Sequence, residues 1–143
     1  MSELVVTARF MGGMKVDAES GGHRVRMDYP IPPQSAADGF TPLQLLLASL
    51  AGCAGNVVPL LLRRMKQPLD GLRLEVRAQR RTEHPTVLTE IEVEFILQGT
   101  GLDPVLVERA IRQADEQLCP VWAMLRPATP IRTSFRIEPQ GMS

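Results

Sequence analysis

Apolar and polar residues alternate along the N-terminal third of the chain. Three stretches, residues 4–10, 14–18 and 25–29, place an apolar side chain at every second position, with charged residues between. This period of two is typical of β-strands that bury one face. The pairs Gly12-Gly13 and Gly21-Gly22 separate the stretches, where tight turns need positive φ. The pattern predicts a meander of three strands.

The middle of the chain changes to a long apolar segment. Residues 30–40 contain three prolines and little periodicity, so we expect a loop there. Thr41 and Pro42 then supply a helix N-cap and a proline at the first helical position. Residues 43–62 contain no charged side chain, which predicts a helix that is apolar on all sides. We expect Pro59 to kink this helix or to end it early.

Twenty uncharged residues also meet the length criterion for a membrane span. The small residues between positions 48 and 55 suit close helix contact, and the amphipathic strands on both sides describe a sheet that needs an apolar cover. We therefore expect a core helix and no membrane. One sheet can cover only one side of such a helix, so the other side is predicted to meet a second copy in a homodimer.

The second half of the chain returns to alternation. Residues 72–78 and 91–97 predict two strands, and residues 131–137 predict a last one. Between them, Asp103 and the proline after it open a second helix that we expect to end near Cys119. The predicted order is βββ-α-ββ-α-β, an α+β fold.

The second predicted helix has one apolar face and one charged face. Glu108 and Arg112 are spaced to pair on the charged face. The residues expected on the apolar face are Leu106, Ala110, Ile111, Ala114 and Leu118. At 143 residues the chain is long enough for one hydrophobic core, and we expect a single domain over residues 1–143.

Charge and cysteine content narrow the function. Sixteen basic residues balance sixteen acidic ones, and no basic run occurs, so we expect no nucleic acid partner. The N-terminus does not show the pattern of a secretory signal, which favours a cytoplasmic location. Two cysteines, 66 positions apart, are too few for a secreted disulfide framework. In a reducing compartment they are free, redox-active or merely buried.

The two cysteines are the candidate reactive groups. Cys53 lies in the middle of the long helix among small residues that leave room near the sulfur, although an inert core thiol is the default interpretation at such a position. Cys119 precedes Pro120, which can start a new helical turn and make Cys119 its N-cap. Backbone N–H groups there favour a thiolate. The alternative is that Cys119 only closes the core beneath Trp122 and Leu125.

Other chemistries find no support in the sequence. His23 and His84 could join the cysteines at a metal only without any of the usual ligand spacings, so we expect no metal. No Gly-rich phosphate loop, nucleophile-elbow serine or paired-carboxylate motif occurs, and no cofactor is expected.

Several motifs spread over nearly the whole chain carry a family resemblance. They are FMGGM, MDYP, GFTPLQLLLASLAGC, MKQPLDGLRLEV and CPVWAML. With them the chain resembles the OsmC/Ohr family, in its OsmC-like branch. The resemblance implies an intertwined homodimer, in which antiparallel sheets with strands from both chains wrap around two long central helices. It also places the sites at the dimer interface.

The resemblance also implies a function. In the peroxidase members, the first cysteine attacks an organic hydroperoxide and becomes a sulfenic acid. The second cysteine condenses with it to a disulfide, which an external dithiol reduces. By this resemblance Cys53 is the peroxidatic and Cys119 the resolving residue, and the partners are a small hydroperoxide and a dithiol reductant. The expected role is defence against peroxide stress.

The chain departs from the peroxidase members at two positions. Where the Ohr subgroup has an arginine after the paired glycines, this chain has Met14, and no glutamate follows the proline that opens the helix. Gln44 is a candidate for the acidic position, but at about 100° per residue it lies opposite Cys53. Arg24 and Arg26 are the nearest cations, but a solvated strand face explains them better. We therefore expect slow peroxidase activity. The alternative is a non-enzymatic dimer that binds a small hydrophobic ligand at its interface.

Overall fold

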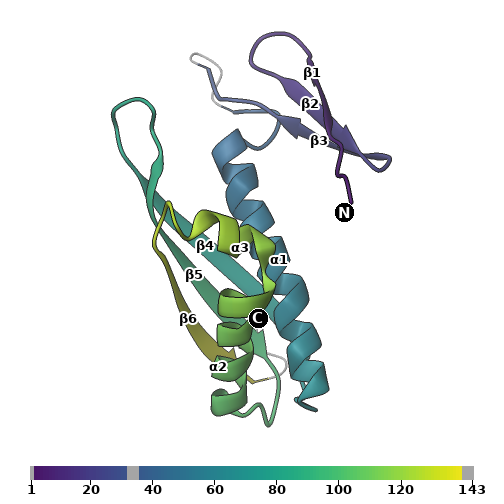
Figure 1. Cartoon of the computed structure of the whole chain (residues 1–143), viewed down its shortest axis with the longest axis vertical. Coiled ribbons are helices and arrows are strands. Elements are labelled where there is room, and N and C mark those ends of the chain that lie inside the picture. Colours follow the sequence, from purple (N-terminus) through teal and green to yellow (C-terminus); the bar gives the residue numbers. More distant parts are fainter. Residues whose placement is uncertain (1, 32–35, 140–143) are drawn as a thin grey trace. The chain divides into compact units, whose positions relative to one another are not determined.

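The computed structural model describes residues 2–31 and 36–139 (Figure 1). Residues 32–35 of the predicted loop lie outside this range. The chain divides into two compact units, Met1–Leu47 and Ala48–Ser143, and each is described by itself.

The first unit contains a meander of three antiparallel strands. These are β1 (Thr7–Phe10), β2 (Val16–Ser20) and β3 (His23–Met27). Gly12 and Gly13 have φ of 97° and 60°, and Gly21 and Gly22 have φ of 58° and 81°. A side chain at these positions would be strained, so the glycine pairs make the turns possible. The predicted meander is confirmed.

The long helix, α1 (Pro42–Arg64), begins where the sequence predicts. The backbone N–H of Thr41 donates to Gln44 Oε1 at 2.9 Å, and the N–H of Gln44 donates to Thr41 Oγ1 at 3.2 Å. This is a capping box, in which each side chain satisfies a free N–H of the first turn. The expected early end at Pro59 is wrong, because the helix continues to Arg64 despite the N–H that proline lacks.

The second unit contains a three-stranded sheet and the remaining helices. The strands are β4 (Gly71–Arg80), β5 (Leu88–Gln98) and β6 (Ile131–Glu138). The helices are α2 (Pro104–Gln113), the π-helix η1 (Ala114–Leu118) and α3 (Pro120–Leu125). The α+β class and the predicted order of elements are confirmed, with η1 and α3 added before the last strand.

The pairing in this second sheet corrects one expectation. β4 and β5 are antiparallel, as are the strand pairs of the first unit, but β5 and β6 run parallel. The expectation of purely antiparallel sheets is therefore wrong for this pair. The chain returns from the end of β5 to the start of β6 through three helical segments, and such a crossover makes parallel pairing possible.

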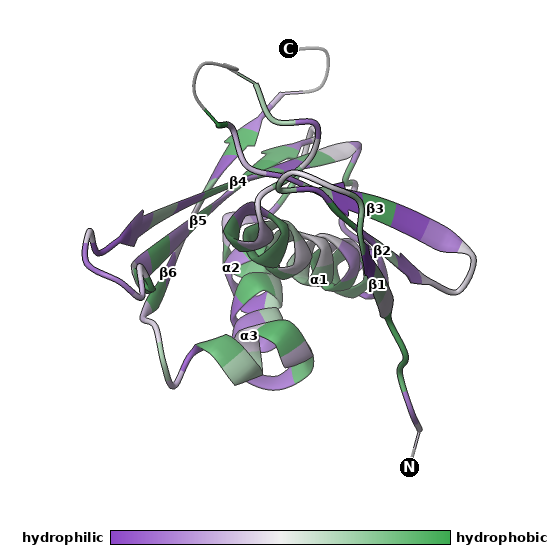
Figure 2. Ribbon diagram, turned by 90° about the horizontal axis from the view of Figure 1, so that it is seen from above, coloured by the Kyte–Doolittle hydropathy of each residue, from purple (hydrophilic) through white to green (hydrophobic). Residues whose placement is uncertain are grey.

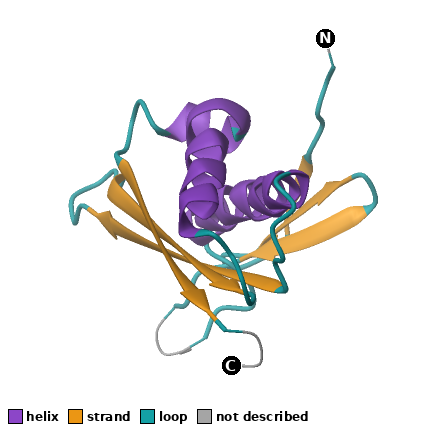
Figure 3. Cartoon of the chain, turned by 90° about the horizontal axis from the view of Figure 1, so that it is seen from below, coloured by secondary structure: helices purple, strands orange, loops and turns teal. Residues whose placement is uncertain are grey.

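The core lies between the second sheet and the helices. Ile91, Val93, Phe95 and Leu97 alternate along β5 and are at most 1% exposed. In Figure 2 the strands alternate hydrophobic and hydrophilic residues. The helices lie on one face of this sheet in Figure 3. The close approach of α1 to β4 supports this arrangement. A Cβ added at Gly55 on α1 would lie 3.5 Å from Leu74 Cδ1 on β4.

The end of the second predicted helix differs from its expected form. After Gln113 the helix widens to a π-helix, closed by a 2.9 Å bond from the N–H of Cys119 to the carbonyl of Ala114. The extra residue per turn rotates the following side chains away from the apolar face. Leu118, which was expected on that face, is 48% exposed. Val107, Ala110, Ile111 and Ala114 are buried.

Candidate functional site

The second unit brings Cys53 and Cys119 together. Both are free thiols, and their side chains share a hydrogen bond. Cys53 lies on α1 and is partly exposed, whereas Cys119 lies between η1 and α3 and is 2% exposed. Local sequence patterns gave no reason for residues 66 positions apart to meet. The contact places two sulfur atoms where either one can react with the other.

A buried indole fixes the two segments that carry the cysteines. Trp122 Nε1 donates a hydrogen bond of 2.9 Å to the backbone carbonyl of Leu50. Leu50 precedes Cys53 by three positions, and Trp122 follows Cys119 by three. Trp122 is 1% exposed, and its ring lies 6.4 Å from that of Phe95 on β5. The sequence indicated only a core position for Trp122, although a buried indole N–H generally needs an acceptor.

Cys119 confirms one prediction and corrects another. It is the N-cap of α3, and its carbonyl accepts a 3.0 Å bond from the N–H of Ala123. The expected thiolate is wrong, because burial raises the pKa of Cys119 to about 12, together with the hydrogen bond to Cys53 and the negative charge of that neighbour. Loss of water around the sulfur raises the pKa of Cys119 more than the dipole of a helix of six residues can lower it.

Small residues surround Cys53 on α1. Ala54 is fully buried, and Gly55 packs toward Leu74. Gly52 is exposed, and a Cβ added there would meet no atom within 4 Å. The helix therefore packs on its sheet through one side and leaves open space on the side of Gly52, next to the reactive candidate.

Arg26 is occupied by two carboxylates of the first unit. Its Nε and Nη2 bond the two oxygens of Asp17 at 2.7 and 3.0 Å, and its Nη1 bonds Asp38 at 2.8 Å. The hydrogen bond from Arg26 lowers the pKa of Asp17, and the two carboxylates raise the pKa of Arg26. This geometry makes Arg26 a structural tie between β2, β3 and the segment that leads to α1.

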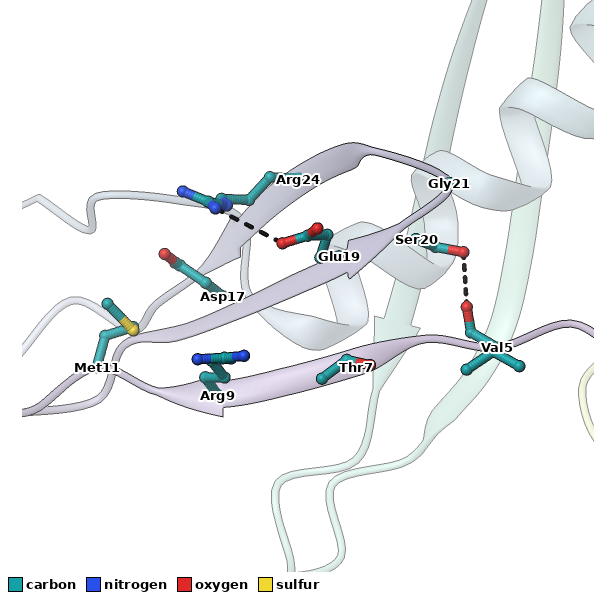
Figure 4. A pocket seen from close by; sticks show the side chains of 9 residues that line it. All are labelled: Val5, Thr7, Arg9, Met11, Asp17, Glu19, Ser20, Gly21 and Arg24. Carbon is teal, nitrogen blue, oxygen red and sulfur yellow. Dashed lines mark hydrogen bonds and ion pairs between the residues drawn. The ribbon is translucent and has the colours of Figure 1, made fainter.

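A polar groove of about 600 Å³ lies on the same sheet (Figure 4). Arg9 and Arg24 alternate there with Asp17 and Glu19, and Arg24 lies 3.5 Å from Glu19. Opposite charges lie on neighbouring strands, so the positive and negative charges of this sheet face largely neutralise each other. Neither cysteine lines this groove. The interpretation of Arg24 and Arg26 as part of a solvated strand face agrees with this arrangement.

Gln44 has a structural explanation as well. Its amide oxygen accepts the N–H of Thr41 and so completes the capping box at the start of α1. The signal was present in the sequence as Thr-x-x-Gln ahead of an apolar run.

The length and composition of α1 also meet the criterion for a membrane-spanning helix. The helix has 23 residues, and an 18-residue window within it has a mean hydropathy of 2.0, which is long and apolar enough to cross a membrane. Within that window, 28% of the residues are buried in the chain. A core helix of a soluble protein can have the same length and composition.

Comparison with known proteins supports the assignment of the fold. Protein YhfA of Escherichia coli is 28% identical over 130 residues, covering 90% of this chain and 94% of that protein. An OsmC-like protein from Mycoplasma pneumoniae superposes with a TM-score of 0.83 at 20% identity, over 95% of this chain and 97% of that one. An organic hydroperoxide resistance protein from Elizabethkingia anophelis superposes with a TM-score of 0.73 at 18% identity, over 96% and 98%.

The family model described as OsmC-like protein matches residues 35–134, a range that contains both cysteines and most of the elements around them. The motifs quoted from the sequence pointed to the same family. The chain belongs to the OsmC-like protein family.

Proposed function

We propose that this protein reduces organic hydroperoxides, with Cys53 as the peroxidatic and Cys119 as the resolving residue. The observation that carries the proposal is the contact between the two thiols in the second unit. Membership of the OsmC-like family, whose fold is shared by proteins named for organic hydroperoxide resistance, supports a thiol protein of the peroxide-stress response.

Exposure and protonation favour this order of roles. Cys53 is partly exposed, so a small hydroperoxide can approach its sulfur. Cys119 is 2% exposed, and its pKa is raised to about 12 by burial and by Cys53. Attack on a peroxide requires a thiolate, which Cys119 does not provide at neutral pH. The buried thiol is suited to the second step, in which it meets an oxidised partner already in contact with it.

The proposed cycle balances in three steps. The Cys53 thiolate attacks the terminal oxygen of ROOH, the O–O bond breaks, and the alkoxide takes a proton to leave as ROH. Cys53 is now a sulfenic acid. The Cys119 sulfur then displaces hydroxide, which leaves as water with the Cys119 proton, and the disulfide forms. A dithiol reduces the disulfide, becomes oxidised itself and restores both thiols.

The missing cation sets the expected rate. A positive donor beside the leaving oxygen would stabilise the alkoxide that develops in the first step. Arg26 is bonded to Asp17 and Asp38, and Met14 stands where the Ohr subgroup has arginine. We infer a slow first step, limited by the charge that develops on the leaving oxygen.

We further infer a homodimer in the cytoplasm. α1 leaves Ala48, Gly52, Asn56 and Leu60 exposed at intervals of four, which form one face of a helix. Leu60 is 42% exposed, and Phe10 on the apolar face of the first sheet is 73% exposed. Apolar surfaces of this kind generally mark an interface. The family resemblance implies an intertwined homodimer, so a second copy is the favoured cover for α1.

The open space beside Gly52 favours a second candidate function. In a dimer it would form part of a pocket between the two helices, where a small hydrophobic ligand could bind without chemistry. The cysteines would then be core residues. A tight ligand that co-purifies with a protein inert to hydroperoxide would identify this function.

Mass spectrometry of the reduced protein tests the proposal. We expect one equivalent of cumene hydroperoxide to produce an intramolecular Cys53–Cys119 disulfide, with the loss of two hydrogens. Prior alkylation of the thiols should prevent this change. Recovery of both thiols unmodified after prolonged exposure would contradict the proposed function and favour the ligand-binding alternative.

A further inference from the structure

An ion pair holds the segment that carries Cys119. Asp115 is the second residue of η1, and Arg126 is the C-cap of α3. Their side chains are 22% and 39% exposed and contact each other through Asp115 Oδ1 and Arg126 Nη2. Cys119 lies between these two residues in the sequence. It is both the C-cap of η1 and the N-cap of α3. The pair therefore closes a short loop of chain around the resolving thiol.

The need for Arg126 follows from Pro120. In a π-helix a carbonyl accepts the N–H five residues later, as Ala114 does from Cys119 at 2.9 Å. The corresponding donor for Asp115 would be residue 120, and proline has no N–H. Arg126 Nη2 replaces it, donating to the Asp115 carbonyl at 3.0 Å. One guanidinium thus compensates a carbonyl that the helix itself cannot satisfy.

The carboxylate of Asp115 strengthens this dependence. Its Oδ1 is buried, and the Arg126 guanidinium that contacts it supplies its counter-charge. A buried carboxylate oxygen that loses its counter-charge is costly. Loss of Arg126 would therefore leave two oxygens of Asp115 uncompensated and release the turn that presents Cys119.

We propose that Arg126, acting through Asp115, is a positioning residue that holds the Cys119 sulfur against Cys53 and so sets the rate of disulfide formation. Its catalytic consequence rests on the proposed function. Neither side chain forms a hydrogen bond or ion pair with Cys53 among the described residues, so the first oxidation does not depend on them. Trp122 separately anchors α3 to α1, which keeps the effect of an Arg126 variant local.

The test compares Arg126→Gln with Arg112→Gln. Arg112 is the control, because it is 55% exposed on α2 and its carboxylate partner is Glu108, at 3.7 Å, and not Asp115. Sulfenic acid at Cys53 is trapped with dimedone after one equivalent of cumene hydroperoxide, and disulfide is followed by alkylation and mass spectrometry. We expect Arg126→Gln to prolong the life of the sulfenic acid on the order of tenfold to a hundredfold, with Cys53 oxidised at the wild-type rate.

Two further variants separate positioning from general loss of structure. Arg126→Lys keeps the charge and one donor, so it should restore part of the rate, and Asp115→Asn keeps the carbonyl contact and should have an intermediate effect. If Arg126→Gln does not fold, the sulfenic acid lifetime in Arg126→Lys provides the test. A sulfenic acid lifetime equal to that of Arg112→Gln in a folded Arg126 variant would overturn the inference.

Diamide distinguishes failure of this inference from failure of the proposed function. It oxidises two neighbouring thiols to a disulfide and is itself reduced to the hydrazine, without any peroxide. Slower diamide-driven disulfide formation in Arg126→Gln would support the positioning role even if the wild-type protein did not react with cumene hydroperoxide. Equal diamide rates would count against it. A wild-type protein inert only to hydroperoxide contradicts the proposed function alone.

Discussion

Trp122 Nε1 donates a 2.9 Å hydrogen bond to the carbonyl of Leu50, and the two residues stand one helical turn from Cys119 and Cys53 respectively. This bond joins α3 to α1 at the level of the two sulfurs. It explains how thiols on separate helices are held in contact, since neither helix needs to move for them to meet.

The variant Trp122→Phe keeps an aromatic ring but removes the donor to Leu50. We expect it to lower the free energy of unfolding by about 1 kcal/mol, a typical value for one lost hydrogen bond. The cost stays small because the Leu50 carbonyl remains part of the helical backbone of α1. Disulfide formation should slow as well. Denaturant unfolding and alkylation kinetics measure the two effects. Wild-type values for both would show that the bond does not hold the cysteines.

Exchange of single sulfurs should separate the two steps of the reaction. Cys53→Ser should abolish hydroperoxide consumption, whereas Cys119→Ser should allow one turnover and leave a sulfenic acid on Cys53. The measurement is peroxide consumed per protein, with dimedone labelling. Equal single-turnover rates in the wild type and Cys53→Ser would remove the peroxidatic assignment.

The buried Cys119 thiol should make the protein sensitive to alkali. Its pKa of about 12 exceeds the ordinary value of 9.0, so above pH 9.0 the unfolded chain loses this proton while the folded chain keeps it. Stability from this group is complete below pH 9.0 and decreases as pH rises toward 12. Cys119→Ala should unfold with a flatter pH dependence in this window. A decrease of equal slope in both proteins would assign it to other groups.

Dimerisation can be tested through the exposed face of α1. Splitting a dimer would expose the apolar stripe around Gly52 and Leu60, so we expect no stable folded monomer. Sedimentation at low micromolar concentration should show a dimer for the wild type, and Gly52→Arg should weaken it. A folded, soluble monomer of the wild type would contradict the prediction.

Local signals in the sequence were enough for most elements. Glycine pairs predicted the turns of the first sheet, and Thr41 predicted the start of α1. Asp103 caps α2 by accepting the N–H of Val105 at 2.9 Å, and the Glu108–Arg112 pair forms at 3.7 Å. Each of these features depends on residues within a few positions, where capping, turn and spacing rules apply.

Features that depend on tertiary packing could not be predicted from local patterns. The π-helix before Cys119 has no periodic signal, and the parallel partner of β5 is set by the crossover that precedes β6. Burial reversed the expected protonation of Cys119, because the N-cap position was readable but the loss of solvent was not. The contact of Cys119 with Cys53 depends on how α3 docks, which Trp122 determines.

The rate of Cys53 oxidation tests the missing cation. Arg26 is bonded to Asp17 and Asp38, so it is not free to stabilise the alkoxide that leaves in the first step, and we expect slow hydroperoxide consumption. The comparison is with Arg26→Gln, which removes the tie between these carboxylates and should leave the rate of Cys53 oxidation unchanged. Single-turnover oxidation by one equivalent of cumene hydroperoxide, with Cys53→Ser as the blank, provides the measurement. A fast reaction in the wild type that is lost in Arg26→Gln would show that Arg26 serves the site after all.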